Sequence, residues 1–92
     1  SMALDYWLNK LMFDLQGEDG RDLWTNHREE VIAKYPVSLE IKQALLKDDF
    51  AFLYHKTNPY LMRFFLLICG HGDAESIKIL SAIDPQEKLN NG

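Results

Sequence analysis

Hydrophobic residues recur along this chain with the period of an α-helix rather than that of a strand. Near the start they fall three and four residues apart, which places them on one helical face: Leu4, Trp7, Leu8, Leu11, Met12 and Leu15. We expect this helix to end near Gly17, because two glycines within residues 17–20 interrupt the period. A short turn over residues 21–25 is then expected to bury Leu23 and Trp24.

Polar residues that cap helices precede the other apolar runs. Asn26, Ser38 and Asp48 each stand where a side-chain oxygen can accept a hydrogen bond from the first free amides of a helix. Asn58-Pro59 is a stronger start signal, because proline at the first helical position gives up a donor that has no partner there. Asp73 is expected to cap the last helix in the same way.

The predicted fold class is all-α, a compact orthogonal bundle of about six short helices. The sequence contains no extended alternating run that would predict a strand, and no period of twenty or more residues recurs. A chain of 92 residues can build one core, with a thin margin of stability. We expect the helical domain to span residues 3–85, a polar flexible tail to follow over 86–92, and residues 1–2 to be the remnant of an expression tag.

The segment YLMRFFLLIC at residues 60–69 has Arg63 as its one charged residue. It is too short to cross a bilayer, which takes about 20 apolar residues, so we expect no membrane association. Either the other helices wrap it completely, or part of it forms an exposed apolar patch that binds a partner. The predicted interface residues are Tyr60, Arg63, Phe64, Phe65, Leu67 and Ile68.

The charge and the cysteine content indicate which class of partner and which cellular compartment to expect. Fourteen acidic and ten basic side chains give a net charge of −4, and no stretch gathers the lysines and arginines that would neutralise phosphates. We therefore expect no nucleic-acid partner. Cys69 is the one cysteine, so no internal disulfide can form, and a reducing cytoplasmic compartment is expected.

No arrangement of residues predicts catalysis. His27, His55 and His71 do not stand at a recognised metal-ligand spacing. The stretch GHGD at residues 70–73 is interpreted as a turn and a helix cap, because it lacks the Lys-Ser/Thr of a phosphate loop and follows a helix rather than a strand. Asp48-Asp49 is interpreted as an acidic pair at a helix start. We expect no catalytic residue, metal or cofactor in this chain, and no enzymatic activity of its own.

Four motifs form a pattern of helix starts, a Tyr-Pro break and an Ala-Leu-Leu stretch. They are LNKLMFDL at residues 8–15, REEVIAKYPVS at 28–38, ALLKDD at 44–49 followed by Leu53-Tyr54, and NPYL at 58–61. From about Leu4 to Ile83, this pattern resembles the LigA-like family. Its members are the small alpha subunit of protocatechuate 4,5-dioxygenase and its relatives among the extradiol ring-cleavage dioxygenases.

The resemblance implies a role in aromatic compound degradation. In that family the large beta subunit carries the non-haem Fe(II), and the small subunit packs against it and partly covers the active site. The chain would then be a non-catalytic module that docks on and caps a larger catalytic subunit. Many relatives have His-Pro where this chain has Asn58-Pro59, so no role of that histidine is carried over.

Two other interpretations remain open. A similar helical domain is the recognition part of precursors for borosin-type peptide backbone N-methyltransferases, a class of ribosomal peptide (RiPP) biosynthesis. Residues 66–73 resemble the core at the end of such borosin precursors, which implies an S-adenosylmethionine-dependent modifying enzyme as partner and a modified segment at Leu66, Leu67, Ile68 and Cys69. Here the chain continues for nineteen residues, which favours an ordinary turn between helices. The third interpretation is a stand-alone ligand-binding or scaffold domain.

Overall fold

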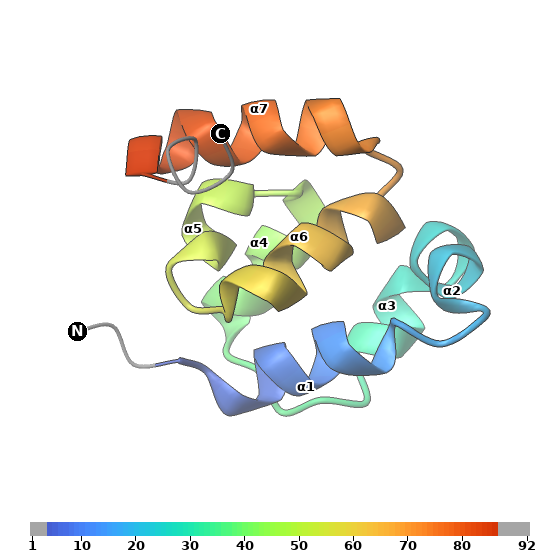
Figure 1. Cartoon of the computed structure of the whole chain (residues 1–92). Coiled ribbons are helices and arrows are strands. Elements are labelled where there is room, and N and C mark those ends of the chain that lie inside the picture. Colours follow the sequence, from blue (N-terminus) through green and yellow to red (C-terminus); the bar gives the residue numbers. More distant parts are fainter. Residues whose placement is uncertain (1–3, 87–92) are drawn as a thin grey trace.

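The computed structural model describes residues 4–86, and within them the chain forms helices and turns without a strand (Figure 1). The helices are α1 (Tyr6–Asp14), α2 (Gly20–Asn26), α3 (Arg28–Ile32), α4 (Leu39–Lys47), α5 (Phe50–Tyr54), α6 (Pro59–Ile68) and α7 (Asp73–Ile83). The predicted all-α class is confirmed. These seven helices exceed the expected six because α2 forms where a short turn was predicted. The predicted tag remnant and all of the predicted tail except Gln86 lie outside the described residues.

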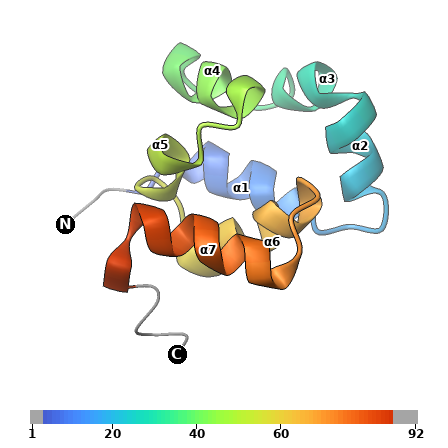
Figure 2. The ribbon, with the colours of Figure 1, turned by 90° about the horizontal axis from the view of Figure 1, so that it is seen from above.

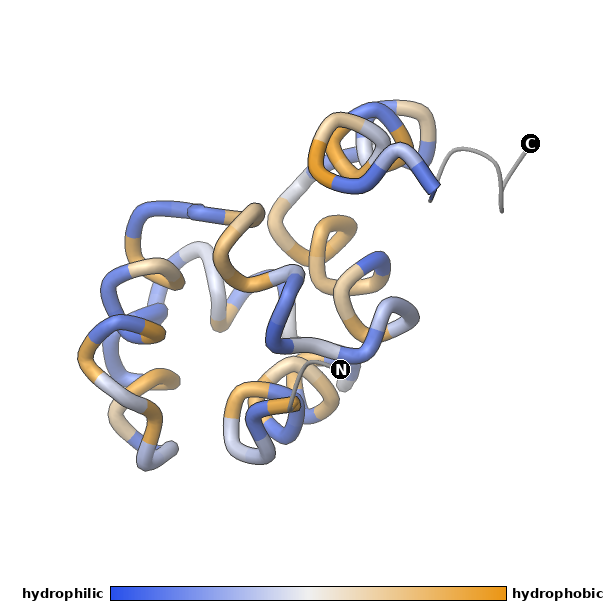
Figure 3. Tube along the Cα trace, turned by 90° about the vertical axis from the view of Figure 1, so that its left-hand side faces the viewer, coloured by the Kyte–Doolittle hydropathy of each residue, from blue (hydrophilic) through white to orange (hydrophobic). Residues whose placement is uncertain are grey.

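Helix α6 lies at the centre of the bundle, between α7 and α1, and it also contacts α2 (Figure 1). Helices α2, α3 and α4 form the side opposite α7 (Figure 2). Hydrophobic and hydrophilic segments alternate along the helices of the trace, as amphipathic helices require (Figure 3). Helix α6 buries Met62, Phe65, Leu66 and Ile68, and the rings of Phe65 and Trp24 meet edge to face with their centroids 5.4 Å apart. Each such side chain contributes about 1.5–3 kcal/mol when fully buried.

Two of the predicted caps are confirmed. The Ser38 hydroxyl accepts a hydrogen bond from the amide of Ile41 at 3.2 Å. The side-chain oxygen of Asn58 accepts from the amides of Tyr60 at 2.8 Å and Leu61 at 3.4 Å, with Pro59 at the first helical position. These local signals therefore fix the starts of α4 and α6.

Two other predicted caps are wrong. Asn26 is the last residue of α2 rather than the cap of the next helix, and its side chain donates to Asp22 one turn earlier. Helix α3 starts after His27 without a side-chain cap. Helix α7 has Gly72 as its cap residue, so Asp73 is already helical. The Asp73 carboxylate is still stabilising in the first turn of α7, because acidic groups are favoured near the positive end of the helix dipole.

The predicted cap at Asp48 is also wrong, since this residue closes α4 in the left-handed conformation, with φ 57° and ψ 43°. Arg28 donates from Nη1 to the Asp48 carboxylate at 3.0 Å and to the carbonyl of Leu45 at 3.1 Å, and it lies over the Trp24 ring. This clamp compensates for a conformation that non-glycine residues rarely adopt. Asp49 is the cap of α5 instead, accepting from the amide of Phe52.

Tyr35, which follows α3, is joined to α1. Its hydroxyl donates to Asp14 at 2.6 Å, and Lys10 donates to the other oxygen of the same carboxylate at 2.8 Å. Partial burial, together with the Asp14 carboxylate, raises the pKa of Tyr35 to about 12. The hydrogen bonds from Lys10 and then Tyr35 lower the pKa of Asp14. The Tyr35 hydroxyl therefore keeps its proton, and the Asp14 carboxylate stays ionised, at and around neutral pH.

Asn9 joins α1 to the turn that leads into α6. Its side-chain oxygen accepts from the amide of Asn58 at 2.8 Å, and its amide group donates to the carbonyls of Lys56 at 3.0 Å and of Asp5. The amide of Asp5 also donates to the Lys56 carbonyl at 3.0 Å. One polar side chain thus satisfies three backbone groups and sets where α6 begins relative to α1.

Gly20 allows the chain to fold back closely on the end of α1. A Cβ atom at this position would lie 1.7 Å from the carbonyl oxygen of Leu15 and 3.2 Å from a methyl group of Ile68. Only glycine fits so near a backbone atom. The glycine therefore fixes how α2 approaches both α1 and α6.

None of the helices in the described part of the chain has the length and apolar character needed to span a membrane.

We predict that Gly20→Ala lowers the free energy of unfolding by about 3 kcal/mol, because the added methyl group forces the backbone of residues 15–20 to move. Gly17→Ala is the matched control, since its Cβ would make an ordinary contact, at 3.7 Å from the Asp14 carbonyl oxygen. Urea denaturation monitored by circular dichroism measures both. Equal stability of the two variants would contradict the close contact at Gly20.

We predict that Asn9→Ala lowers the free energy of unfolding by about 2 kcal/mol, because the amide of Asn58 loses its acceptor and the carbonyl of Lys56 loses one of its two donors. Asn26→Ala serves as the comparison, since its exposed side chain bonds only Asp22 in the described structure, and it should change stability by less than about 0.5 kcal/mol. The same urea titration measures this. A loss of similar size in both variants would argue against the role of Asn9 in joining α1 to the start of α6.

Candidate functional site

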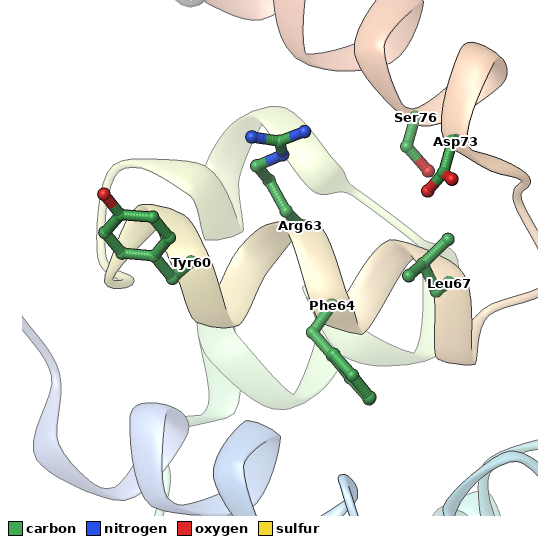
Figure 4. Close-up of a pocket in the computed structure, with 6 residues that line it drawn as sticks. All are labelled: Tyr60, Arg63, Phe64, Leu67, Asp73 and Ser76. Atoms are coloured by element: carbon green, nitrogen blue, oxygen red, sulfur yellow. The ribbon is translucent and has the colours of Figure 1, made fainter. Parts of the chain in front are cut away.

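The outward side of α6 carries large apolar side chains that the other helices leave uncovered. Tyr60 is 81% exposed and Phe64 is 41% exposed, and both lie on the face opposite the buried residues of the helix. Arg63 and Leu67 are half-buried on the same face. Tyr60, Arg63, Phe64 and Leu67 project from successive turns in Figure 4, with Phe64 directed toward the side on which α1 lies.

A groove of about 200 Å³ runs between this face and the start of α7. Asp73 and Ser76 form its α7 side, and both side chains lie beside Leu67 (Figure 4). Ser76 is buried, and its hydroxyl donates to the carbonyl of His71 at 3.3 Å. The groove thus has an apolar floor from α6 and polar groups at its α7 edge. Its lining residues are Tyr60, Arg63, Phe64, Leu67, Asp73 and Ser76.

The structure brings four of the six predicted interface residues together and excludes the other two. Tyr60, Arg63, Phe64 and Leu67 all line the groove. Phe65 and Ile68 were predicted wrongly as surface residues, because their exposed fractions are 1% and 7% and both belong to the core. They occupy the inward side of the same helix. We call the set Tyr60, Arg63, Phe64 and Leu67 the α6 face.

The segment considered for backbone methylation, Leu66 to Cys69, lies at the end of α6. Leu66, Leu67 and Ile68 are helical, and the amide of Cys69 donates to the carbonyl of Phe65 at 2.9 Å. An N-methylated amide cannot donate the hydrogen bond that a helix requires. Modification at these positions would therefore need α6 to unwind.

A second group of exposed aromatic residues lies on α1, and sequence reasoning missed it. Tyr6 and Phe13 are 66% and 58% exposed, and Trp7, expected on the buried face, is 41% exposed with its ring against Tyr6. Leu4, expected on the same buried face, is 56% exposed. The spacing of Tyr6 and Phe13, seven residues apart, could have revealed a second apolar stripe on this helix.

Helix α1, which carries these exposed aromatic residues, contacts α6. Asn9 is bonded to Asn58, the residue that precedes the first turn of α6. Phe64 is directed toward the side of α6 on which α1 lies (Figure 4). Exposed aromatic side chains therefore occur on two helices that contact each other.

The histidines have local partners. His27 contacts Glu30, His71 contacts Glu75 and lies edge-on to the Phe50 ring, and the His55 ring meets Tyr54. Among residues 4–86, no group of three His, Cys, Asp or Glu side chains is placed to hold a metal ion.

Cys69 is half-buried at the end of α6. Burial raises the pKa of its thiol to about 12, and the Asp48 carboxylate adds to this effect while Arg28 opposes it. The thiol therefore stays protonated at neutral pH, and a protonated thiol is a poor nucleophile and metal ligand.

Comparison with known proteins gives no relative: no family model, curated protein or solved structure matches this chain. The resemblance to the LigA-like family accordingly stays a prediction from the sequence pattern.

We predict slow alkylation of Cys69 in the folded protein. A pKa of about 12 in place of 9.0 lowers the thiolate fraction at pH 8 about a thousandfold. Reaction with iodoacetamide at pH 8, followed by intact mass, should be slower by about that factor than in the urea-unfolded chain, and should accelerate about tenfold for each unit of pH as long as the fold persists. Equal rates in the folded and unfolded chains would contradict the raised pKa of the Cys69 thiol.

Proposed function

We propose that this chain is a non-catalytic helical module that docks through the α6 face on the catalytic subunit of an extradiol ring-cleavage dioxygenase and caps it. The observation that carries the proposal is the division of α6 into two apolar sides. One side builds the core with Met62, Phe65 and Leu66, and the other leaves Tyr60 and Phe64 exposed. A contiguous exposed apolar surface is typical of a protein interface.

The composition of the α6 face supports a protein partner. Aromatic residues and arginine are enriched among the residues that carry most of the energy of protein interfaces. Tyr60, Arg63 and Phe64 supply these types from one rigid helix that is held at its start by Asn58 and Asn9. A rigid face loses little conformational entropy on binding.

The nature of the partner comes from the sequence pattern. The motifs at residues 8–15, 28–38, 44–49 and 58–61 resemble those of small subunits that pack on an iron-containing subunit. In the proposed complex the non-haem Fe(II) and the ring-cleavage chemistry belong to the partner. This chain would supply apolar surface that covers its active site.

We predict that the chain, when it is co-expressed with the catalytic subunit of an extradiol dioxygenase from the same organism, co-purifies with that subunit. Replacing both Tyr60 and Phe64 by alanine should weaken the complex at least about tenfold, because interface aromatic anchors contribute about 2 kcal/mol or more. Isothermal titration calorimetry measures the affinity, and catechol cleavage by the mixture provides a second readout.

Leu39→Ala is the matched control for this experiment. Leu39 is 69% exposed on α4, and no residue of α4 lines the groove beside α6, so the substitution removes exposed apolar surface outside the groove. Thermal melts establish that both variants fold. The proposal fails if the catalytic subunit does not bind, or if the double variant binds it as tightly as the control.

A further inference from the structure

The groove beside α6 carries one charge of each sign in its lining. These charges are the guanidinium of Arg63 and the carboxylate of Asp73, and the apolar lining residues are Tyr60, Phe64 and Leu67. Arg63 projects from the middle of α6, whereas Asp73 lies beside Leu67 at the end of that helix (Figure 4). The two charges therefore occupy different points of a groove whose floor is apolar.

Both charges can bind a further group. Asp73 makes no hydrogen bond or ion pair with residues 4–86. Arg63 has an interaction of its own, but a guanidinium carries five N–H donors and can bind a second acceptor. Arg21 adds a cation at this end of α6, where its guanidinium is bonded to the carbonyl of Leu67 at 2.7 Å.

This arrangement disfavours an occupant that carries a single charge. An acidic side chain in the groove would be repelled by Asp73, and a basic side chain would be repelled by Arg63 and Arg21. A surface that presents a cation and a carboxylate at separate points, with apolar groups beside them, would meet neither repulsion. A second copy of the same groove presents this combination.

We propose that a second copy of this chain covers the groove, with the α6 helices of the two copies antiparallel around a twofold axis. In such a contact one surface meets itself, so Arg63 of each copy lies opposite Asp73 of the other and two ion pairs form. The same contact covers Tyr60 and Phe64, which are 81% and 41% exposed in the single chain.

The dimer is expected to be weak, with a Kd on the order of 100 µM, because a shallow groove supports only a small contact area, of the size found in transient interfaces. The chain is then monomeric at low micromolar concentration. The inference goes beyond the proposed function but uses the same α6 face. A catalytic subunit that binds this face would therefore displace the second copy.

Sedimentation equilibrium between about 10 µM and about 1 mM measures the dimer. Arg63→Glu and Asp73→Arg should each raise its Kd at least about tenfold, because each turns both ion pairs into repulsive contacts. An equimolar mixture of the two variants should associate nearly as tightly as the natural chain, since the mixed dimer again pairs opposite charges at both places. Asp73→Arg also reduces the net charge of −4, so overall repulsion cannot explain a weaker dimer in that variant.

Lys42→Glu and Glu29→Arg are the matched controls. They reverse charges at exposed positions of α4 and α3 that do not line the groove, and each should change the Kd by less than about threefold at physiological ionic strength. Thermal melts establish that the variants fold, and if Arg63→Glu does not fold, the comparison of Asp73→Arg with Glu29→Arg decides.

Three results would overturn the dimer proposal: a natural chain that stays monomeric at about 1 mM, a dimer that Asp73→Arg leaves intact, or a mixture of folded variants that associates no more tightly than each variant alone. These measurements do not involve the dioxygenase subunit, so the two proposals can fail separately. A chain that dimerises as described but does not bind the catalytic subunit would refute the proposed function alone. A chain that binds this subunit but never dimerises would refute the dimer alone.

Discussion

The structure depends on covering α6, the most hydrophobic helix of the chain, with helices that are all short. A helix buried on every side must be surrounded by neighbours, and in this fold α1, α2 and α7 surround only part of it. Met62, Phe65, Leu66 and Ile68 take the covered side. The remaining apolar surface stays exposed because none of the other helices in residues 4–86 covers it.

Much of the fold was predictable because its signals are local. Helical periodicity, the Ser38 cap and the Asn58-Pro59 start depend on neighbours within four residues, and the structure contains them as expected. Asn26 and Asp48 were predicted as helix caps from similar signals, but neither caps the helix that follows it. Asn26 bonds to Asp22 within α2, and Asp48 is held by a contact from far along the chain. Arg28, twenty residues before Asp48, holds that residue at the end of α4 instead of the start of α5.

The site was predictable only in part, for a related reason. The sequence showed that residues 60–69 carry more apolar surface than a small bundle covers, but periodicity could not tell which side faces inward. Phe64 and Phe65 are adjacent and chemically identical, yet one is exposed and the other is packed against Trp24. On α1, Leu8 and Leu11 reach the core while Tyr6 and Phe13 do not, because the polar bonds of Asn9 orient the helix.

Hydroxyl-radical footprinting with mass spectrometry tests the central claim most directly, because it reports the exposure of each side chain in solution. In the free chain, the account predicts rapid oxidation of Tyr60 and Phe64 and protection of Phe65, with Tyr60 and Phe64 becoming protected when the catalytic subunit is added. Similar oxidation of Phe64 and Phe65 in the free chain would contradict the two-sided α6, and unchanged oxidation of Tyr60 and Phe64 in the mixture would contradict docking through the α6 face.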